Sequence, residues 1–290
     1  MFDYRYHALS LAAVLLALAV GVLIGVAIGD SNLVSSAKNG IVHDLNSEVS
    51  GARRQVEQLQ DKLSDEEAFA GGLYPLAVHG LLSERSIGLV FLGGSSDQVN
   101  RLVRSAVTQA GGNVAIVVAV REPLNLQGIG REAAGTHYAA LEGNPALIER
   151  FGELAGRQLV SGGQLVEREL LSRVRGGLLS AFDGQLGRLD GLVVVRADPT
   201  DMNPEQSEAS AAFESGLLTG VAAVGVPAVG IELTGTEPTQ ISWYKSKNIS
   251  SVDDLDAPAG QAALVYALAG AHGAFGVKPT ADSLLPSAVP

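Results

Sequence analysis

The sequence predicts an N-terminal transmembrane helix and a coiled-coil helix, followed by an α/β domain with a mainly parallel, doubly wound sheet of the flavodoxin or Rossmann-like kind. Three observations predict this organisation: an uncharged apolar segment, a polar segment with an apolar heptad repeat, and a remainder in which short apolar runs alternate with helix-like segments. We expect a cytoplasmic N-terminus (1–7), a transmembrane helix (8–29), a coiled-coil linker helix (31–70), an exported α/β domain (73–278) and a flexible tail (279–290).

Composition limits the classes of function. A chain of 290 residues with 47% hydrophobic residues can bury one good-sized core once the N-terminal stretch is set aside. The formal charge of −11 repels phosphates, so we expect no nucleic acid partner. The absence of cysteine excludes disulfides and thiolate metal sites.

The apolar segment from Ala8 to Gly29 carries no charge over 22 residues. A helix of that length spans about 33 Å, enough to cross a hydrocarbon layer of about 30 Å. Arg5 precedes the segment and Asp30 follows it, so we expect a cytoplasmic N-terminus and a domain outside the cell membrane. The alternative is a cleaved signal peptide with its cleavage site at 27–29, although such apolar regions are normally only about 7–15 residues long.

Small residues form a stripe on this predicted helix. Gly21, Gly25 and Gly29 follow one another at intervals of four, which places them on one helical face. Such a stripe lets a second transmembrane helix approach closely, so it indicates self-association or a membrane partner. The alternative is that glycine is simply common in membrane helices.

The segment after the anchor has an apolar heptad repeat among charged residues. Its apolar positions, in alternating steps of three and four, are Val42, Leu45, Val49, Ala52, Val56, Leu59 and Leu63. A polar helix with one apolar stripe must pack on a second copy, on another protein or back on its own domain. We expect a homo-oligomer, with Gly71-Gly72 and Tyr74-Pro75 ending the helix.

The remaining chain alternates strand and helix signals. The predicted strands, continuously apolar and thus buried on both faces, are 87–92, 114–120, 192–195 and 226–233. The predicted helices are 98–109, 145–159, 164–174 and 205–218. Residues 240–243 indicate an edge strand, and 259–271 a closing helix with Asp256 as its N-cap.

Three polar motifs follow predicted strands or precede a predicted helix, where a ligand site could form. Gly93-Gly94-Ser95-Ser96 follows the first strand but lacks a dinucleotide or P-loop pattern, so a tight turn with a serine N-cap is the favoured interpretation. Asp198-Pro199-Thr200-Asp201 follows the third strand, where carboxylates would suit a cation or ribose, although helix entry is favoured. Asp253, Asp254 and Asp256 lack the pattern of a calcium loop, so we expect helix capping.

No catalytic constellation is evident, and we predict that the chain is not an enzyme. There is no G-x-S-x-G elbow and no cysteine, and the histidines lack H-x-x-x-H spacing. The soft or imidazole donors from Leu73 onward are His79, His137, His272 and Met202. We name the three histidines as candidate metal ligands and assign no cofactor, because these donors are few and dispersed.

Three stretches of the sequence resemble the MctB-like family of actinobacterial envelope proteins. They are Tyr6–Gly25, Gln109–Val114 and Ile249–Val265, the last with the aspartate segment. The resemblance implies an envelope location and a role in copper export or homeostasis. It also implies, as in similar corynebacterial proteins, a second membrane protein or a cell-wall hydrolase as partner. The chain departs from the family in keeping only His272 where members often have a histidine- and glycine-rich stretch. A cell-envelope scaffold acting through its coiled coil, without a direct metal role, is the alternative function.

Overall fold

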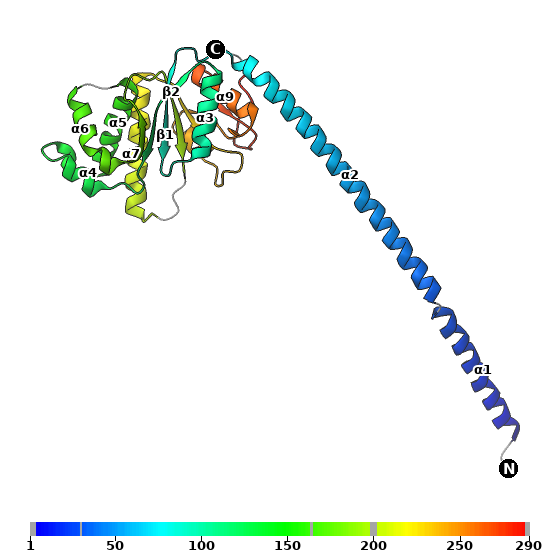
Figure 1. The fold of residues 1–290 in the computed structure, drawn as a ribbon. Helices are drawn as coiled ribbons and strands as arrows, with labels where there is room; N and C mark the ends of the chain where they lie inside the picture. The colour runs from blue at the N-terminus through cyan, green and yellow to red at the C-terminus, as the bar shows by residue number, and fades with distance from the viewer. Residues whose placement is uncertain (1–3, 30, 163–164, 198–201, 288–290) are drawn as a thin grey trace. The chain divides into compact units, whose positions relative to one another are not determined.

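A computed structural model describes residues 4–29, 31–162, 165–197 and 202–287 (Figure 1). The chain divides into two compact units, Met1–Glu66 and Glu67–Pro290. Each unit is described by itself.

The first unit consists of helices. Helix α1 (Tyr4–Ile28) contains a span, Arg5–Ala27, that is long and apolar enough to cross a membrane, with a mean hydropathy of 2.8. The prediction of an apolar N-terminal helix is confirmed. Helix α2 (Ser31–Val78) follows, and its residues up to Glu66 belong to this unit.

Helix α2 does not end where the sequence predicted. It continues through Gly71, Gly72 and Pro75 to Val78, although proline inside a helix costs about 3 kcal/mol. Tertiary packing offsets that cost, because Tyr74 and Val78 are buried in the second unit. The Tyr74 hydroxyl donates to the carbonyl of Ala106 at 3.5 Å, and Tyr266 donates to the carbonyl of Ala77 at 3.0 Å. The predicted helix break was therefore wrong.

The second unit is built on a seven-stranded sheet in the order β3-β2-β1-β4-β5-β6-β7. The strands are β1 (Ser86–Leu92), β2 (Asn113–Val120), β3 (Leu179–Gly184), β4 (Gly191–Arg196), β5 (Ala228–Ile231), β6 (Ser250–Val252) and β7 (Ala274–Phe275). Neighbouring strands are parallel except β2 and β3, which are antiparallel. The prediction of a mainly parallel sheet is confirmed.

Helices lie on both faces of the sheet (Figure 1). Those on one face are α4 (Leu126–Glu132), α5 (Pro145–Ser161), α6 (Leu165–Leu178) and α7 (Pro204–Val224), with the 3-10 helix η1 (His137–Ala140) beside them; α3 (Asp97–Gln109) and α9 (Pro258–Ala269) lie on the other. Strand residues alternate between two apolar clusters: Val90 and Leu92 pack in one, Leu89 and Phe91 in the other. Burial on both faces explains why the strands are continuously apolar.

Both clusters lie entirely within the second unit. The first described residue in either cluster is Tyr74, near the end of α2. The core of Glu67–Pro290 is therefore complete without α1 and without the part of α2 that precedes Glu67. A unit with its own core is expected to fold by itself.

Two predicted elements differ in the structure. Residues 240–243 were predicted as an edge strand but begin helix α8 (Ile241–Ser246). Ile241 and Tyr244 are three apart and both buried, which is helical spacing. Asp256 was predicted as the N-cap of the last helix, but α9 has Ala257 there without a side-chain cap, and Asp256 accepts hydrogen bonds from the amide and hydroxyl of Thr234.

The segment after Lys278, which we expected to be flexible, contacts the domain. The amide of Asp282 donates to the carbonyl of Ala274 at 2.7 Å, and its carboxylate accepts from the amide of Ala274 at 3.0 Å. Lys245 forms an ion pair with Asp282 at 2.8 Å. These contacts fix residues near Asp282 beside β7; residues 288–290 lie outside the described residues.

Candidate functional site

Charged side chains gather where the parallel strands end. Because the carboxyl ends of parallel strands share one edge of the sheet, residues that follow different strands meet there. The carboxyl-edge cluster consists of Glu122 after β2, Arg196 at the end of β4, Glu232 after β5, Asp253 and Asp254 after β6, together with Glu214, Gln240 and Lys278. Most of these side chains are buried, so each needs a partner.

Arg196 is the centre of one half of this cluster. Its Nε lies 3.2 and 3.1 Å from the two carboxylate oxygens of Glu214, which is almost fully buried on α7. Its Nη1 donates to Gln240 at 2.5 Å, and its guanidinium stacks on Trp243 at 4.8 Å. The buried carboxylate of Glu214 is therefore paired with a cation.

The pKa of Glu122 is raised beside Glu214 and Arg196. Burial, followed by the charge of Glu214 and the hydrogen bond between the two carboxyl groups, raises the pKa of Glu122 to about 8, although Arg196 opposes this. The raised pKa favours the protonated form of Glu122, which can donate to the carboxylate of Glu214.

Tyr244 also belongs to the half of the cluster around Arg196. Its hydroxyl accepts from the amide of Arg196 at 2.9 Å and lies 3.3 Å from the carbonyls of Val194 and Ile231. The ring lies against Gly230 on β5, where an added Cβ would overlap the ring atoms. Tyr244 thus bridges two neighbouring strand ends.

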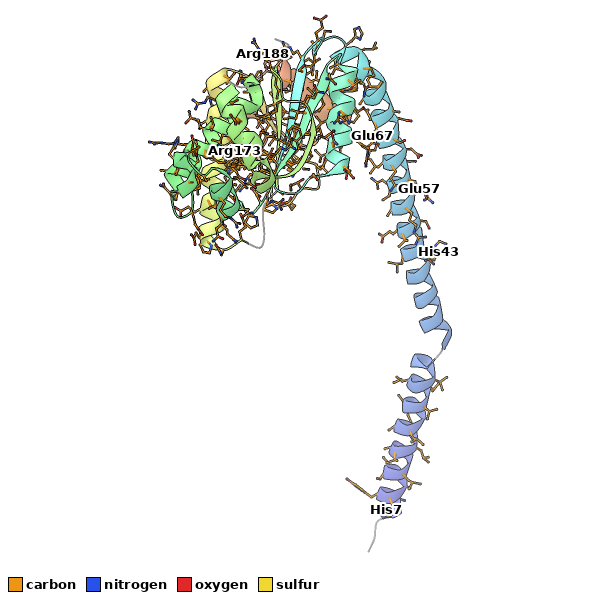
Figure 2. All side chains as sticks on the ribbon, turned by 60° about the vertical axis from the view of Figure 1, so that its left-hand side comes forward. His7, His43, Glu57, Glu67, Arg173 and Arg188 are labelled. Carbon is orange, nitrogen blue, oxygen red and sulfur yellow. The ribbon has the colours of Figure 1, made fainter. Side chains whose placement is uncertain are left out.

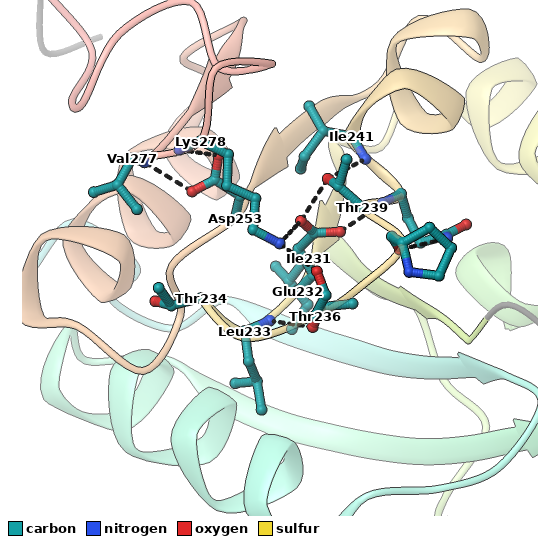
Figure 3. Close-up of polar contacts among 12 residues, drawn as sticks. Ile231, Glu232, Leu233, Thr234, Thr236, Thr239, Ile241, Asp253, Val277 and Lys278 are labelled. Atoms are coloured by element: carbon teal, nitrogen blue, oxygen red, sulfur yellow. Dashed lines mark hydrogen bonds and ion pairs between the residues drawn. The ribbon is translucent and has the colours of Figure 1, made fainter.

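Glu232 organises the other half (Figure 3). Its Oε1 accepts from Lys278 Nζ at 2.6 Å and from the Thr239 hydroxyl at 2.7 Å, and its Oε2 accepts from the amide of Gln240 at 2.6 Å. Lys278 also donates to the carbonyl of Thr236 at 2.7 Å. Glu232 is satisfied on both oxygens, which indicates that it fixes the loop before α8 and the C-terminal segment.

Asp253 and Asp254 do not cap a helix, so the capping prediction was wrong. Asp253 accepts from the amides of Val277 and Lys278 at 2.8 and 3.1 Å (Figure 3). Asp254 is buried, and its carboxylate has no hydrogen-bond partner on another described residue. Burial, then the charges of Asp253 and Asp256, raises the pKa of Asp254 to about 6.

The two loop motifs have different outcomes. Ser96 caps α3 by accepting from the amide of Val99 at 3.3 Å, and Gly93 has a φ of +103°, so the predicted turn with a serine N-cap is confirmed. The motif from Asp198 to Asp201 lies outside the described residues.

The candidate metal ligands occupy separate elements. His79 follows α2, His137 begins η1 with its ring 4.0 Å from that of Tyr138, and His272 follows α9; all three are exposed. Among the described residues, no group of three or more histidine, aspartate or glutamate side chains is arranged to hold a metal ion.

The candidate oligomerisation residues are exposed within a single chain. The side chains of Leu45, Val49, Val56, Leu59 and Leu63 on α2 are 42–60% exposed. The side chain of Val42 lies outside the described residues. An added Cβ would meet nothing within 4 Å at Gly21 or Gly25, and at Gly29 it would meet only backbone of α1.

Sequence reasoning missed the Arg196 and Glu232 halves of the carboxyl-edge cluster. A signal was present, because Glu122, Arg196 and Glu232 each follow an apolar run within two residues of its end. A charge at that position of a parallel strand points to the carboxyl edge. The pairing with Glu214 and Lys278 depends on the fold and has no local signal.

Comparison with known proteins identifies related chains. A family described as "Copper transport outer membrane protein, MctB" matches residues 1–286. Relatives named "Copper transporter MctB", from Mycobacterium bovis and from two strains of Mycobacterium tuberculosis, are 26% identical over 224 residues, which is 76% of this chain. The aligned part spans 62% of the relatives' own length.

Proposed function

Because the chain belongs to the MctB family, we propose that it is a single-pass membrane protein that takes part in copper export or homeostasis at the cell envelope. In this proposal the chain acts as an oligomer and catalyses no reaction. The observation that carries it is the family match over residues 1–286, from the apolar helix through the α/β domain.

The membrane topology follows from charge. Arg5 precedes the apolar span and Asp30 follows it, which favours a cytoplasmic N-terminus and an exported domain. The uncharged length of α1 and its exposed apolar side chains support an uncleaved anchor.

Copper as cargo requires more than one copy of the chain. A single transmembrane helix encloses no water path, and a globular α/β domain cannot line one through lipid. The exposed stripe of α2 provides a surface for assembly: Leu45, Leu59 and Leu63 recur at heptad spacing, which suits a coiled coil. The stripe equally favours a second candidate function, a scaffold that binds a second membrane protein or a cell-wall hydrolase.

Sedimentation tests the oligomer. A fragment from Ser31 to Pro290 should associate, whereas one from Glu67 should be monomeric because it lacks the stripe. Leu59→Asp with Leu63→Asp should abolish association by placing charge in a desolvated seam. Ser50→Asp with Gln58→Asp adds the same charge on the outward side of the heptad and should have little effect. Equal sedimentation of all four proteins would overturn the proposed oligomer.

Calorimetry tests the copper role. We expect Glu67–Pro290 to bind copper(I), with a competing chelator present, and copper(II) weakly or not at all, since its imidazoles are few and dispersed. The full chain in nanodiscs should bind more tightly if assembly creates the site. Submicromolar binding to the fragment that disappears when His79, His137 and His272 are replaced by alanine would place the site within one domain. Copper sensitivity of a deletion strain, compared with its septum morphology, separates transport from the scaffold function.

A further inference from the structure

An apolar cavity of about 110 Å³ lies in the second unit, on the face of the sheet away from α3 and α9. It is lined by residues of α5, α6 and α7 and of strands β2 and β3, and it opens to the surface. Apart from Gln158, Ser172 and Arg175, every lining side chain is apolar. The cavity is separate from the carboxyl-edge cluster and from the three candidate histidines, none of which lines it.

The cavity has an apolar interior and a polar mouth. Val118, Val120 and Phe213 line it and are buried in the core, whereas Ser172 and Arg175 on α6 are exposed. An engineered apolar cavity of about 150 Å³ stays dry and binds benzene. The smaller space of about 110 Å³, with a similar apolar lining, therefore suits a short length of hydrocarbon chain better than water.

Arg175 gives the mouth a positive charge. Its guanidinium stacks on the Phe182 ring at 4.8 Å, which holds it at the rim. In the part of the chain that the structure describes, Arg175 forms no ion pair. An uncompensated cation in a chain with a formal charge of −11 marks the place where an anion would bind.

We propose that this cavity binds the hydrocarbon chain of an anionic single-chain amphiphile, such as a fatty acid, with its head group on Arg175. The apolar walls exclude a wholly polar ligand, because they would leave its polar groups without partners. The charge at the mouth distinguishes an anionic head group from a neutral or cationic one. The proposal is independent of the copper role and does not require an oligomer.

Calorimetric titration of Glu67–Pro290 with decanoate, 1-decanol and decyltrimethylammonium tests the ligand class. Decanoate should bind about ten-fold more tightly than the cation, the factor expected for one charge-assisted hydrogen bond. Equal affinities of decanoate and decyltrimethylammonium, or no binding of decanoate, would overturn the proposal.

Variants locate the ligand. Ala155→Leu fills the cavity from α5 and should abolish binding of decanoate and 1-decanol. Arg175→Ala should weaken decanoate about ten-fold and leave 1-decanol unchanged. Arg173→Ala is the matched control, because Arg173 is an exposed cation on the same helix but does not line the cavity (Figure 2).

Folding of each variant is checked by near-UV circular dichroism, and Ala155→Met, which adds less bulk, replaces Ala155→Leu if the latter unfolds. Undiminished decanoate binding to a folded Ala155 variant would show that the hydrocarbon lies elsewhere and would overturn the assignment. Equal loss with Arg173→Ala and Arg175→Ala would likewise refute the role of Arg175.

Discussion

Glycines spaced four apart occur both in α1 and in the pair formed by α5 and α7, and their surroundings are opposite. In α1, Gly21 and Gly25 have open space where a Cβ would lie. In α5 and α7, an added Cβ would overlap the backbone of the facing helix. These close approaches are Gly152 to Phe213, Gly156 to Leu217, Gly216 to Glu149 and Gly220 to Glu153.

The difference shows what the spacing does. A glycine pair removes side chains so that two helix backbones can touch, and in α5 and α7 both helices contribute a pair. In α1 the same spacing meets no other helix among the described residues of the chain. The motif therefore indicates close helix packing between α5 and α7, whereas a helix partner for Gly21 and Gly25 of α1 stays a prediction.

The largest expected effect is in the packed pair. Gly156→Leu should destabilise Glu67–Pro290 by about 3 kcal/mol or more, because the new side chain would force apart α5 and α7. Urea unfolding measures the change. Gly176→Leu is the matched control: Gly176 lies on α6 with only one atom, from Glu132, near its added Cβ, so the substitution should be neutral or stabilising. Similar losses for both variants would contradict the proposed close packing.

A smaller effect is expected in the membrane helix. Gly25→Leu should weaken association of the full chain in vesicles by about 1 kcal/mol, the range of packing effects between membrane helices. Energy transfer between labelled chains measures it. Ala27→Leu, on the opposite side of α1, should leave the transfer unchanged. Unchanged transfer in the Gly25→Leu variant would mean that the glycine face makes no contact with another helix. Neither substitution should alter unfolding of Glu67–Pro290, which lacks α1.

The smallest expected effect concerns Glu122, whose carboxyl group interacts with that of Glu214 on α7. Since the folded pKa of Glu122 is raised to about 8, its stabilising contribution is complete below the unfolded pKa and is lost as pH rises through about 8. Between pH 7 and 8, where Asp254 with its pKa of about 6 is already mostly ionised, Glu122→Gln should make the stability fall less steeply with pH. Glu208→Gln, exposed on the same helix, should keep the wild-type slope in urea unfolding at each pH; identical slopes for all three proteins would contradict the raised pKa of Glu122.

The central strands and long helices were predictable because burial leaves a strong pattern. β1, β2 and β4 are continuously apolar, and α5 and α7 begin and end near recognisable caps such as Asn144 and Gly225. β6 was not predictable, because a three-residue strand with two serines has no apolar run. β3 was missed because it pairs antiparallel with β2 and is largely exposed.

The candidate sites were less predictable than the fold. The stripe on α2 depends on local spacing and can be read from the sequence, whereas the pairing of Glu232 with Lys278 joins residues 46 apart. The glycine pairs of α5 and α7 have the same spacing in the sequence as those of α1. Only the pairs of α1 were predicted as a packing surface, because they lie in an uncharged apolar segment. The cavity beside Arg175 could not be predicted from the sequence, because it depends on where side chains from several separate elements lie.

The contact between Gly230 and Tyr244 constrains how this family can evolve. Because the Tyr244 ring occupies the space in which a side chain at position 230 would lie, a larger residue at 230 requires a smaller one at 244. Loss of the Tyr244 hydroxyl would also leave the amide of Arg196 without its acceptor. Positions 230 and 244 should therefore covary among homologous chains.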